Sequence, residues 1–452
     1  MVAQTDRLSI IKLLQKLLSS FILAAVFAFN AYAEPSVLVD DETHELLIHI
    51  VKPIFKTAGV TFDKNKIHIL NDMSLNAFVT DGNHLFVHTG TLLKASNVNE
   101  LSGILAHETG HISGGHVMRQ KLKIQDLQML SAISLIAAGS AAVASGRGDA
   151  AMAVALGAHG SMLNSLISYQ LSEERAADES AVRYLKALHQ SPAGLKNFMK
   201  TIQKNSRLSG YEEVPYFKTH PMNAERLAFF EKKEKQNGGV TSSPYDADFE
   251  LVQAKLSAFL LPEKQVLKTY PLEKNTQASK YAHTIIFLRQ KKYAKALALI
   301  DELISSNLKN PYFYQLKGEI LFESGQIEKS VQAYQKALDI MPDADEIRLA
   351  YASCAMELPQ NKKDLSKIIG LLNQSVLKNE TPRAWELLAK AYYESNQKAQ
   401  SLYASAKYSF LIGNIAVSRL QINEARKANP SKSLSLRLND LENEIKQYQS
   451  DL

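Results

Sequence analysis

The clearest chemistry in this sequence lies in two histidines four residues apart, with a glutamate directly after the first. The pattern H-E-x-x-H comprises His107, Glu108 and His111 and follows an apolar, helix-compatible run. On one helix, histidines at i and i+4 point the same way, so both imidazoles can reach one Zn²⁺. Glu108 lies beside that face and can hold a zinc-bound water and take its proton. The alternative is a pair of surface histidines on an ordinary helix.

A catalytic zinc needs a third protein ligand and an open coordination position. The third histidine of metzincins would stand six residues after His111, but that position is Val117. Later in the chain, the pattern E-x-x-A-D places Glu174 and Asp178 at i and i+4, on one helix face. We expect Glu174 to bind zinc and Asp178 to fix the ring of a ligating histidine. Glu173 is a rival ligand, and a solvated acidic helix face is the alternative.

Together the motifs resemble a known family of zinc metallopeptidases. H-E-x-x-H, then E-x-x-A-D, then T-H-P at His220 is similar to the family that contains the prenyl-protein (CAAX) protease and the heat-shock membrane protease HtpX. The resemblance implies an α+β zincin-like metalloprotease domain with one Zn²⁺ per chain. The implied site residues are the zinc ligands His107, His111 and Glu174, the general base Glu108 and the orienting acid Asp178.

Three further residues near these motifs have open roles. By the resemblance, His220 lies near the metal, where it could stabilise an oxyanion, occupy the fourth zinc position in a resting state, or be a structural histidine. Arg226 could anchor the loop around His220 or assist the reaction intermediate. His116 stands five residues after His111, about 140° around a continuous helix, so we expect it to be structural or to support the site from outside.

Upstream of these motifs, the sequence predicts a β-hairpin. Residues 76–79 and 85–90 are strand-like and flank Asp81-Gly82-Asn83, a strong turn signal. In the family, the strand beside the active site is an edge strand that binds extended substrate by β-addition. The resemblance therefore implies substrate binding by Leu85, Phe86, Val87 and His88. A plain structural hairpin is the alternative.

Residues 127–168 contain two apolar stretches rich in alanine, serine and glycine. Their lengths would allow a bilayer span, but their small residues and serines make them weak spans. We expect two helices packed near the active site, with an apolar edge that touches a membrane surface. A transmembrane hairpin is the alternative.

The first 33 residues are typical of an export signal. Basic residues precede an apolar run over 17–29, and Ala31-Tyr32-Ala33 supplies a small-x-small cleavage pattern before Glu34. An uncleaved membrane anchor is the alternative. Since the resemblance points to a periplasmic branch of the family in Gram-negative bacteria, we expect a periplasmic protein.

The C-terminal half repeats with a period of 34 residues, which resembles the tetratricopeptide repeat (TPR). With Pro311 as the first position, small or apolar residues recur at the repeat's signature positions: Tyr314, Gly318, Leu321, Gly325, Ser330, Tyr334, Ala337 and Pro342. Other registers agree, among them one that begins at Ala399. We expect about four repeats and then a capping helix over 432–448, arranged as an all-α TPR superhelix. A generic helical bundle is the alternative.

These signals divide the chain into four segments. They are a signal peptide (1–33), a zinc metalloprotease domain (34–236), a linker and connecting helix (237–276) and a TPR domain (277–452). The linker assignment rests on the turn-forming, weakly apolar stretch 236–244. Stacked helix pairs form a concave surface that suits a peptide or a partner protein.

Composition narrows the function further. The chain has 452 residues, 46% of them hydrophobic and 22% charged, which excludes a mainly disordered or fibrous protein. Its single cysteine excludes an internal disulfide, and a net charge of +6 over this length indicates no nucleic-acid partner.

By resemblance, the protein clients are outer-membrane β-barrel proteins and their assembly machinery. The alternative function is a TPR chaperone or scaffold with a largely latent protease domain.

Overall fold

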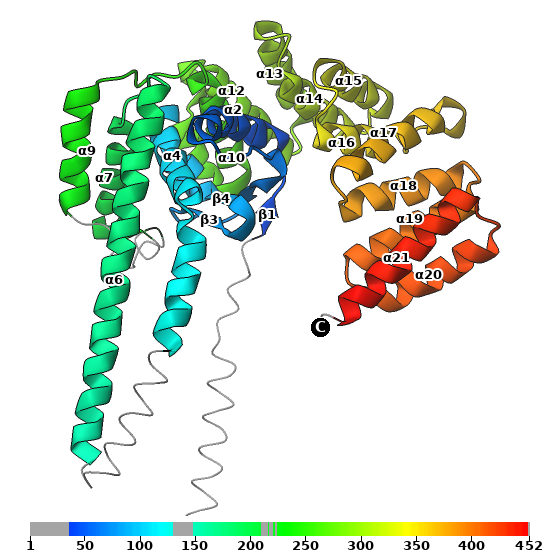
Figure 1. The fold of residues 1–452 in the computed structure, drawn as a ribbon. Coiled ribbons are helices and arrows are strands. Elements are labelled where there is room, and N and C mark those ends of the chain that lie inside the picture. Colours follow the sequence, from blue (N-terminus) through cyan, green and yellow to red (C-terminus); the bar gives the residue numbers. More distant parts are fainter. Residues whose placement is uncertain (1–35, 130–147, 209–215, 217–219, 222–223, 451–452) are drawn as a thin grey trace, which may run out of the picture.

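The computed structural model describes residues 36–129, 148–208, 216, 220–221 and 224–450. The predicted export signal and part of the apolar segment 127–168 lie outside these residues. A small four-stranded sheet lies in the N-terminal half, among helices, and helices alone form the C-terminal half (Figure 1). The predicted order, an α+β protease half and then an all-α TPR half, is confirmed.

The sheet has four short strands in the order β1 (Val37–Leu38), β2 (Ile67–Leu70), β4 (His84–His88) and β3 (Ala77–Thr80). β3 and β4 form the predicted hairpin, with Phe78 opposite Phe86 in an antiparallel register. β4 also pairs with β2, in parallel, so it is a central strand. This corrects the expectation of a free edge at residues 85–88, because hydrogen bonds to β2 and β3 occupy both sides of β4. In the part of the chain that the structure describes, β1 and β3 are the edge strands.

Helix α4 (Val98–Gly114) runs through the middle of the protease half and is buried from Val98 to His111. On one side Leu101 and Leu105 join a core with the sheet and α2 (Asp41–Ala58). On another side Ile104 packs against Phe198 of α7. A helix buried on all sides needs apolar or small residues around its whole circumference, which the run Leu-Ser-Gly-Ile-Leu-Ala supplies. The other helices of this half are α3 (Thr89–Lys94), α6 (Gly148–Ala187), α7 (Ala193–Leu208) and α9 (Ala224–Asn237).

Side-chain hydrogen bonds fix the start of α4, and a glycine ends it. Asn97 Oδ1 accepts a hydrogen bond from the Glu100 N–H (3.0 Å), and Glu100 Oε2 accepts one from the Ser96 N–H (2.9 Å). Such a reciprocal arrangement satisfies N–H groups that a helix start leaves free. At the other end, Gly115 adopts a left-handed conformation with φ of 65°, which ends the helix.

Residues 116–129 form a further helix, which extends beyond the body of the protease half together with the first part of α6 (Figure 1). α6 has 40 residues and returns into the protease half, where its C-terminal part packs against α4. Of the helices in the described ranges, none combines the length and the apolar character that crossing a membrane requires.

Helix α10 (Asp246–Leu260) contributes to both halves of the chain. Phe249, Val252 and Leu256 join the core of the protease half. Leu251, Ala254 and Ala258 join the core of the first TPR helices. The segment 237–276, predicted to be a linker and connecting helix, therefore contains a helix whose two faces are buried in different cores.

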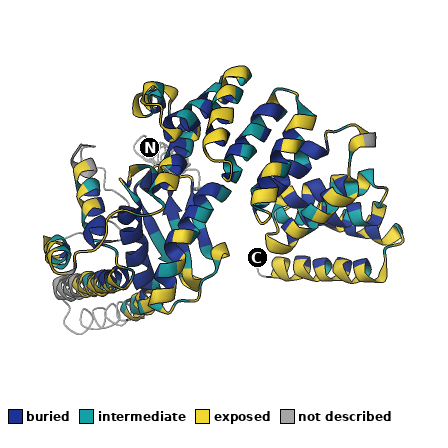
Figure 2. Cartoon of the chain, turned by 90° about the horizontal axis from the view of Figure 1, so that it is seen from above, coloured by how far each residue is buried: buried dark blue, intermediate teal, exposed yellow. Residues whose placement is uncertain are grey.

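The TPR half is a series of antiparallel helices that follow one another in an arc beside the protease half (Figure 1). After α11 (Glu263–Thr269), the helices are α12 (Gln277–Arg289), α13 (Tyr293–Ser306), α14 (Pro311–Glu323), α15 (Ile327–Ile340), α16 (Asp345–Ala355), α17 (Leu365–Lys378), α18 (Pro382–Glu394), α19 (Lys398–Leu411), α20 (Ile415–Lys427) and α21 (Lys432–Ser450). Buried residues lie where neighbouring helices meet, and exposed residues lie along their outer sides (Figure 2).

One hydrogen bond recurs between neighbouring TPR helices. The hydroxyl of a serine donates to the carbonyl oxygen twelve residues earlier: Ser330 to Gly318 (2.6 Å), Ser401 to Ala389 (2.9 Å) and Ser418 to Ala406 (2.8 Å). The small residue at the acceptor position allows the close approach. At Gly318, a Cβ atom would lie 2.9 Å from the Tyr334 ring. The last two pairs share α19, which therefore packs as the second helix of one hairpin and the first of the next.

Candidate metal centre and active site

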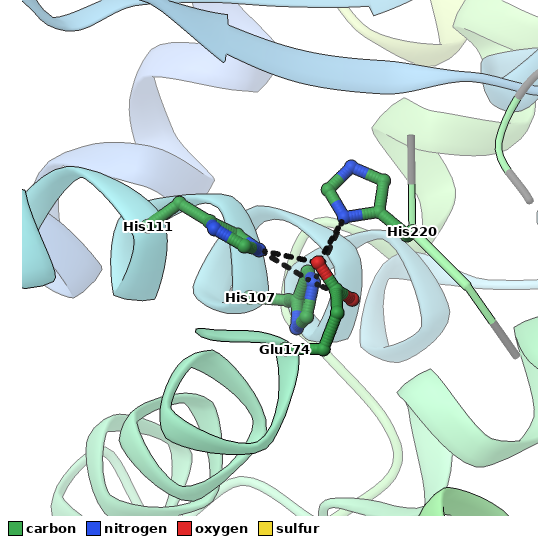
Figure 3. A group of neighbouring side chains, drawn as sticks. All are labelled: His107, His111, Glu174 and His220. Carbon is green, nitrogen blue, oxygen red and sulfur yellow. Dashed lines mark hydrogen bonds and ion pairs between the residues drawn. The ribbon is translucent and has the colours of Figure 1, made fainter. Parts of the chain in front are cut away.

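Four buried side chains from three parts of the chain converge in the protease half (Figure 3). His107 and His111 come from α4, Glu174 comes from α6, and His220 comes from the segment before α9. Each offers a nitrogen or oxygen atom, and these atoms all lie within 4.8 Å of one another. Of the two candidate ligands on α6, Glu174 points into this group, whereas Glu173 contacts His116 and Arg119 outside it.

The spacing within the group fits a tetrahedral metal ion. The Nε2 atoms of His107 and His111 lie 3.1 Å apart, and the Glu174 oxygens lie 3.2–3.3 Å from them. Two ligands bound tetrahedrally at about 2.0–2.1 Å would lie roughly 3.3–3.4 Å apart. Imidazole nitrogens with one carboxylate are also a donor set that Zn²⁺ accepts.

Electrostatics at the group favour a cation. Burial lowers the pKa of His107, but the carboxylates of Glu174 and Asp178 outweigh that effect and raise it to about 10. Burial, with the positive charges of neighbouring histidines, lowers the pKa of His111 to about 3, so this ring is neutral, as a metal ligand must be. The histidines hold the pKa of Glu174 well below its usual value, although burial acts in the opposite direction.

Glycine in the H-E-x-x-H motif brings together the two helices that carry the candidate ligands. A Cβ atom on Gly110 would lie 2.8 Å from the carbonyl oxygen of Ala177 and 3.0 Å from its Cα. Only glycine allows α6 to approach α4 this closely. Glu174 stands one turn before Ala177, so this approach places its carboxylate between His107 and His111.

Asp178 links the ligand His107 to Arg226. Its Oδ1 atom lies 2.9 Å from His107 Nδ1, on the ring side that faces away from the group. Arg226 donates to both oxygens of Asp178, from Nε at 2.7 Å and from Nη2 at 2.9 Å. Arg226 Nη1 also donates to the Pro221 carbonyl oxygen (3.0 Å) and lies 2.8 Å from Glu174 Oε2. Arg226 therefore anchors the segment that carries His220, as one of the two sequence interpretations expected.

Glu108 lies beside the group and is fully buried. Neither of its carboxylate oxygens accepts a hydrogen bond from a described residue, and His220 Nε2 lies 3.4 Å from Oε1. Burial raises the pKa of Glu108, which makes the carboxylate a better proton acceptor than an exposed glutamate. A buried carboxylate without hydrogen bonds lowers the stability of the folded chain, so its presence calls for a functional explanation.

His220 belongs to the group and packs against Tyr216. Its Nδ1 atom lies 3.0 Å from Glu174 Oε1 and 3.3 Å from His107 Nε2. The ring centroids of His220 and Tyr216 are 4.7 Å apart, and both side chains are buried. His220 therefore occupies the position at which a fourth metal ligand would stand.

His116 makes a contact that its position in the sequence does not predict. Its Nδ1 atom lies 2.9 Å from Nδ1 of His111, and its Nε2 atom lies 2.9 Å from Glu173 Oε2. Arg119 in turn donates from Nη2 to the same Glu173 oxygen (2.7 Å). The outer nitrogen of each α4 histidine is thus held by a neighbour: Asp178 for His107, and His116 for His111.

A cleft of about 270 Å³ opens beside the group. Phe78 and Val79 of the edge strand β3 form one wall, and Tyr169 and Gln170 of α6 form part of another. The expected substrate-binding residues Leu85–His88 lie one strand further in, on β4. The turn residues between β3 and β4 predicted that these strands pair. The parallel pairing of β4 with β2, 18 residues upstream, has no such local signal in the sequence.

Comparison with known proteins adds to this geometry. Residues 41–234 match the model of peptidase family M48, and residues 318–352 match a TPR repeat. The chain is 23% identical over 367 residues to the Beta-barrel assembly-enhancing protease of Yersinia pestis, covering 77% of this chain and 72% of that protein. Its identity to the Escherichia coli K12 protein of that name is 22% over 357 residues, covering 77% and 71%. A shorter match, 30% identical over 91 residues, relates 20% of this chain to 17% of human mitochondrial metalloendopeptidase OMA1.

Proposed function

We propose that this chain, a metalloendopeptidase in which TPR repeats follow a peptidase family M48 domain, uses Zn²⁺ to cleave proteins during the quality control and assembly of outer-membrane proteins. The observation that carries the proposal is the buried group of His107, His111 and Glu174, beside which the Glu108 carboxylate accepts no hydrogen bond from a described residue. The names of the relatives from Yersinia pestis and Escherichia coli support a role in the assembly of outer-membrane proteins.

In the proposed mechanism, His107, His111 and Glu174 hold the metal, and Glu108 accepts the proton of the attacking water. Bound Zn²⁺ supplies a Lewis acid and lowers the pKa of water. Asp178 fixes the ring of His107 through the 2.9 Å contact with Nδ1, so that Nε2 faces the metal. After bond cleavage, Glu108 can pass its proton to the leaving amine.

The free edge of β3 is the proposed site for the substrate backbone. Its residues Phe78 and Val79 border the cleft, and among the described residues β3 pairs with β4 alone. An extended segment can therefore add to this edge, with its next residues beside Glu108. The predicted contribution of residues 85–88 becomes indirect, since β4 supports β3.

His220 favours a second state, in which the protease is latent. With His220 as a fourth protein ligand, the metal would have no open position, as in structural zinc sites. The 3.0 Å contact with Glu174 supports this resting arrangement over an oxyanion role. Hydrolysis would then require the His220 side chain to leave this position, while its backbone N–H donates to the Tyr216 carbonyl oxygen at 2.8 Å and Arg226 holds the Pro221 carbonyl oxygen.

The proposed location is the periplasm, with peripheral contact to a membrane. The export signal at 1–33 supports the compartment. Exposed apolar side chains on the helix over 116–129 and on α6 support the contact: Met118, Leu122, Met129 and Ile167. Co-sedimentation of the full chain with vesicles tests this, and loss of binding in Leu122→Ser with Met129→Ser is the expected result.

The test of the mechanism pairs zinc content with proteolysis. His107→Ala, His111→Ala and Glu174→Ala should lose most bound zinc and all hydrolysis, whereas Glu108→Gln should keep zinc and lose turnover. Glu179→Ala, at an exposed position on α6, is the matched control and should keep hydrolysis. Full zinc occupancy in Glu174→Ala, or normal turnover in Glu108→Gln, would overturn the assignment.

A further inference from the structure

The first TPR helices have two opposite faces with different surroundings. On α14, Tyr312 faces the protease half, where its hydroxyl donates to the Asp41 carbonyl oxygen at 3.4 Å. Glu319, two turns later, lies on the same face and lines a small cavity with residues of α10. Tyr314 and Leu321 are offset from this pair by two residues, about 200° around the helix, so they point the other way.

This opposite face is hollowed into a groove. The groove measures about 780 Å³ and lies between α13, α15 and α17, the second helices of three consecutive pairs. A groove of this volume has room for a short extended segment of another chain.

The floor of the groove is apolar and its rim is mainly basic. Leucine, valine and tyrosine side chains form the floor: Leu297, Tyr314, Leu321, Val331 and Tyr351. Four lysines stand around them, with two aspartates: Lys317, Lys329, Lys336 and Lys367, with Asp301 and Asp339. The rim therefore carries an excess of positive charge.

Most of these lysines lack an acidic partner. Lys317 pairs with Asp301 at 2.7 Å. Lys329 donates to Gln326, and Lys367 donates to Gln335 and lies 4.9 Å from the centre of the Tyr351 ring. Lys336 has no ion pair with a described residue, and the same holds for Lys329 and Lys367. Three ammonium groups thus stand around an apolar floor, and none of them forms an ion pair with a described carboxylate.

We propose that this outer groove binds an extended acidic segment of a partner protein. Apolar side chains of the segment would cover the floor, and alternate carboxylates would reach Lys329, Lys336 and Lys367. An extended strand can make both kinds of contact, because its successive side chains point to opposite sides. The inference goes beyond the proposed function, because the groove lies outside the protease half and its binding requires neither zinc nor hydrolysis.

The test measures binding of a labelled ten-residue peptide that alternates Asp or Glu with Leu or Ala. Fluorescence anisotropy is read on the full chain carrying Glu108→Gln, so that the probe cannot be cleaved. Adding Lys336→Glu with Lys367→Glu should weaken binding about tenfold, since two attractions become repulsions. Raising the salt concentration should also weaken binding, because the lysines are exposed.

Matched controls separate the groove from general charge. Lys309→Glu with Lys398→Glu changes the net charge equally at exposed positions outside the groove, and binding should stay within about twofold. Lys336→Gln with Lys367→Gln repeats the test with a milder change and should weaken binding less than the glutamate pair. Circular dichroism confirms that each variant is folded.

Three results would overturn the proposal. The first is equal binding by the groove variants and the control pair. The second is equal binding of a peptide with Asn and Gln in place of Asp and Glu. The third is equal binding of oligo-glutamate or a short DNA duplex, which would indicate unspecific attraction of polyanions.

Discussion

The Nδ1 atoms of His111 and His116 lie 2.9 Å apart, although a continuous helix would hold these residues on different faces. The contact exists because Gly115 ends α4 and the chain changes direction before His116. If His111 binds metal through Nε2, its Nδ1 carries the proton and His116 Nδ1 accepts it. His116 Nε2 then donates to Glu173, so one set of tautomers satisfies the whole chain of contacts.

His116→Ala should therefore lower zinc affinity without removing a ligand. A neighbour that orients a ligating histidine typically contributes 10–100-fold to metal affinity, and we expect a loss of about that size. Competition with a chromophoric chelator measures it. His49→Ala, an exposed histidine on α2, is the control. An unchanged zinc affinity in His116→Ala would leave His116 with only a packing role.

His220→Ala should raise the cleavage of an unfolded substrate several-fold. In the resting arrangement, His220 stands where the fourth ligand would be, and its removal opens that position. Initial rates on a labelled, unfolded protein give the measurement. A strong drop in rate with normal zinc content would instead assign His220 an oxyanion role.

Gly110→Ala should separate the two ligand-bearing helices. The added methyl group would lie 2.8 Å from the Ala177 carbonyl oxygen, and overpacking of this kind costs about 1–3 kcal/mol. Both the free energy of unfolding and zinc affinity should fall. Gly370→Ala on α17 is the matched control, since its Cβ meets nothing within 4 Å, and it should stabilise by about 0.5–1 kcal/mol.

Stability should fall as the pH rises from about 4 to about 7, through two carboxyl groups between the halves. The Glu346 N–H donates to Asp41 Oδ2 at 2.9 Å. Burial raises the pKa of Asp41 from 3.8 to about 6 and that of Glu346 from 4.5 to about 7. In this range the folded chain holds protons that the unfolded chain has lost, so deprotonation destabilises the folded state.

Asp41→Asn should make this fall shallower. It should also raise the free energy of unfolding at pH 8 by about 1–2 kcal/mol, because no charge is then buried at position 41. Urea unfolding at pH 5 and pH 8 gives the comparison, with the exposed Glu250→Gln as control. Parallel pH profiles for the variant and the original chain would contradict the assignment.

A chain that ends at Gln236 should fail to fold cooperatively. It lacks α10, whose Phe249, Val252 and Leu256 belong to the core of the protease half. It also lacks Gln253, whose side-chain amide donates to the carbonyl oxygens of Leu92 and Ala95 at 2.8 Å. A chain that ends at residue 262 keeps these contacts and should unfold in one transition. Thermal unfolding, monitored by circular dichroism, distinguishes the two chains. A cooperative transition in the chain that ends at Gln236 would contradict the prediction.

Local patterns were enough to predict much of the site. The i, i+4 spacings placed His107 with His111 and Glu174 with Asp178, because a helix fixes which side chains share a face. The 34-residue period predicted the TPR helices, because each repeat carries its own packing residues. These features depend on neighbours within a few turns of the chain.

Contacts between distant segments could not be read in this way. The central position of β4 depends on a parallel pairing with β2, and short strands give no signal of their partners. The apolar residues on two faces of α10 do not tell which parts of the chain cover each face. The contact of His116 with His111 depends on the left-handed turn at Gly115. The prediction that these residues lie about 140° apart assumed one continuous helix, without that turn.

Because α10 belongs to the cores of both halves, it also limits where related genes can recombine during evolution. Asp246 at its start accepts a hydrogen bond from the Val98 N–H at the first turn of α4, so the helix that leads into the repeats also supports the helix with the H-E-x-x-H motif. A recombination between relatives at the turn-rich stretch 236–244 would join α10 to a foreign protease core. Crossovers beyond residue 262 would instead keep this helix with its own protease half, and we expect hybrid genes that yield active enzymes to carry their junctions there.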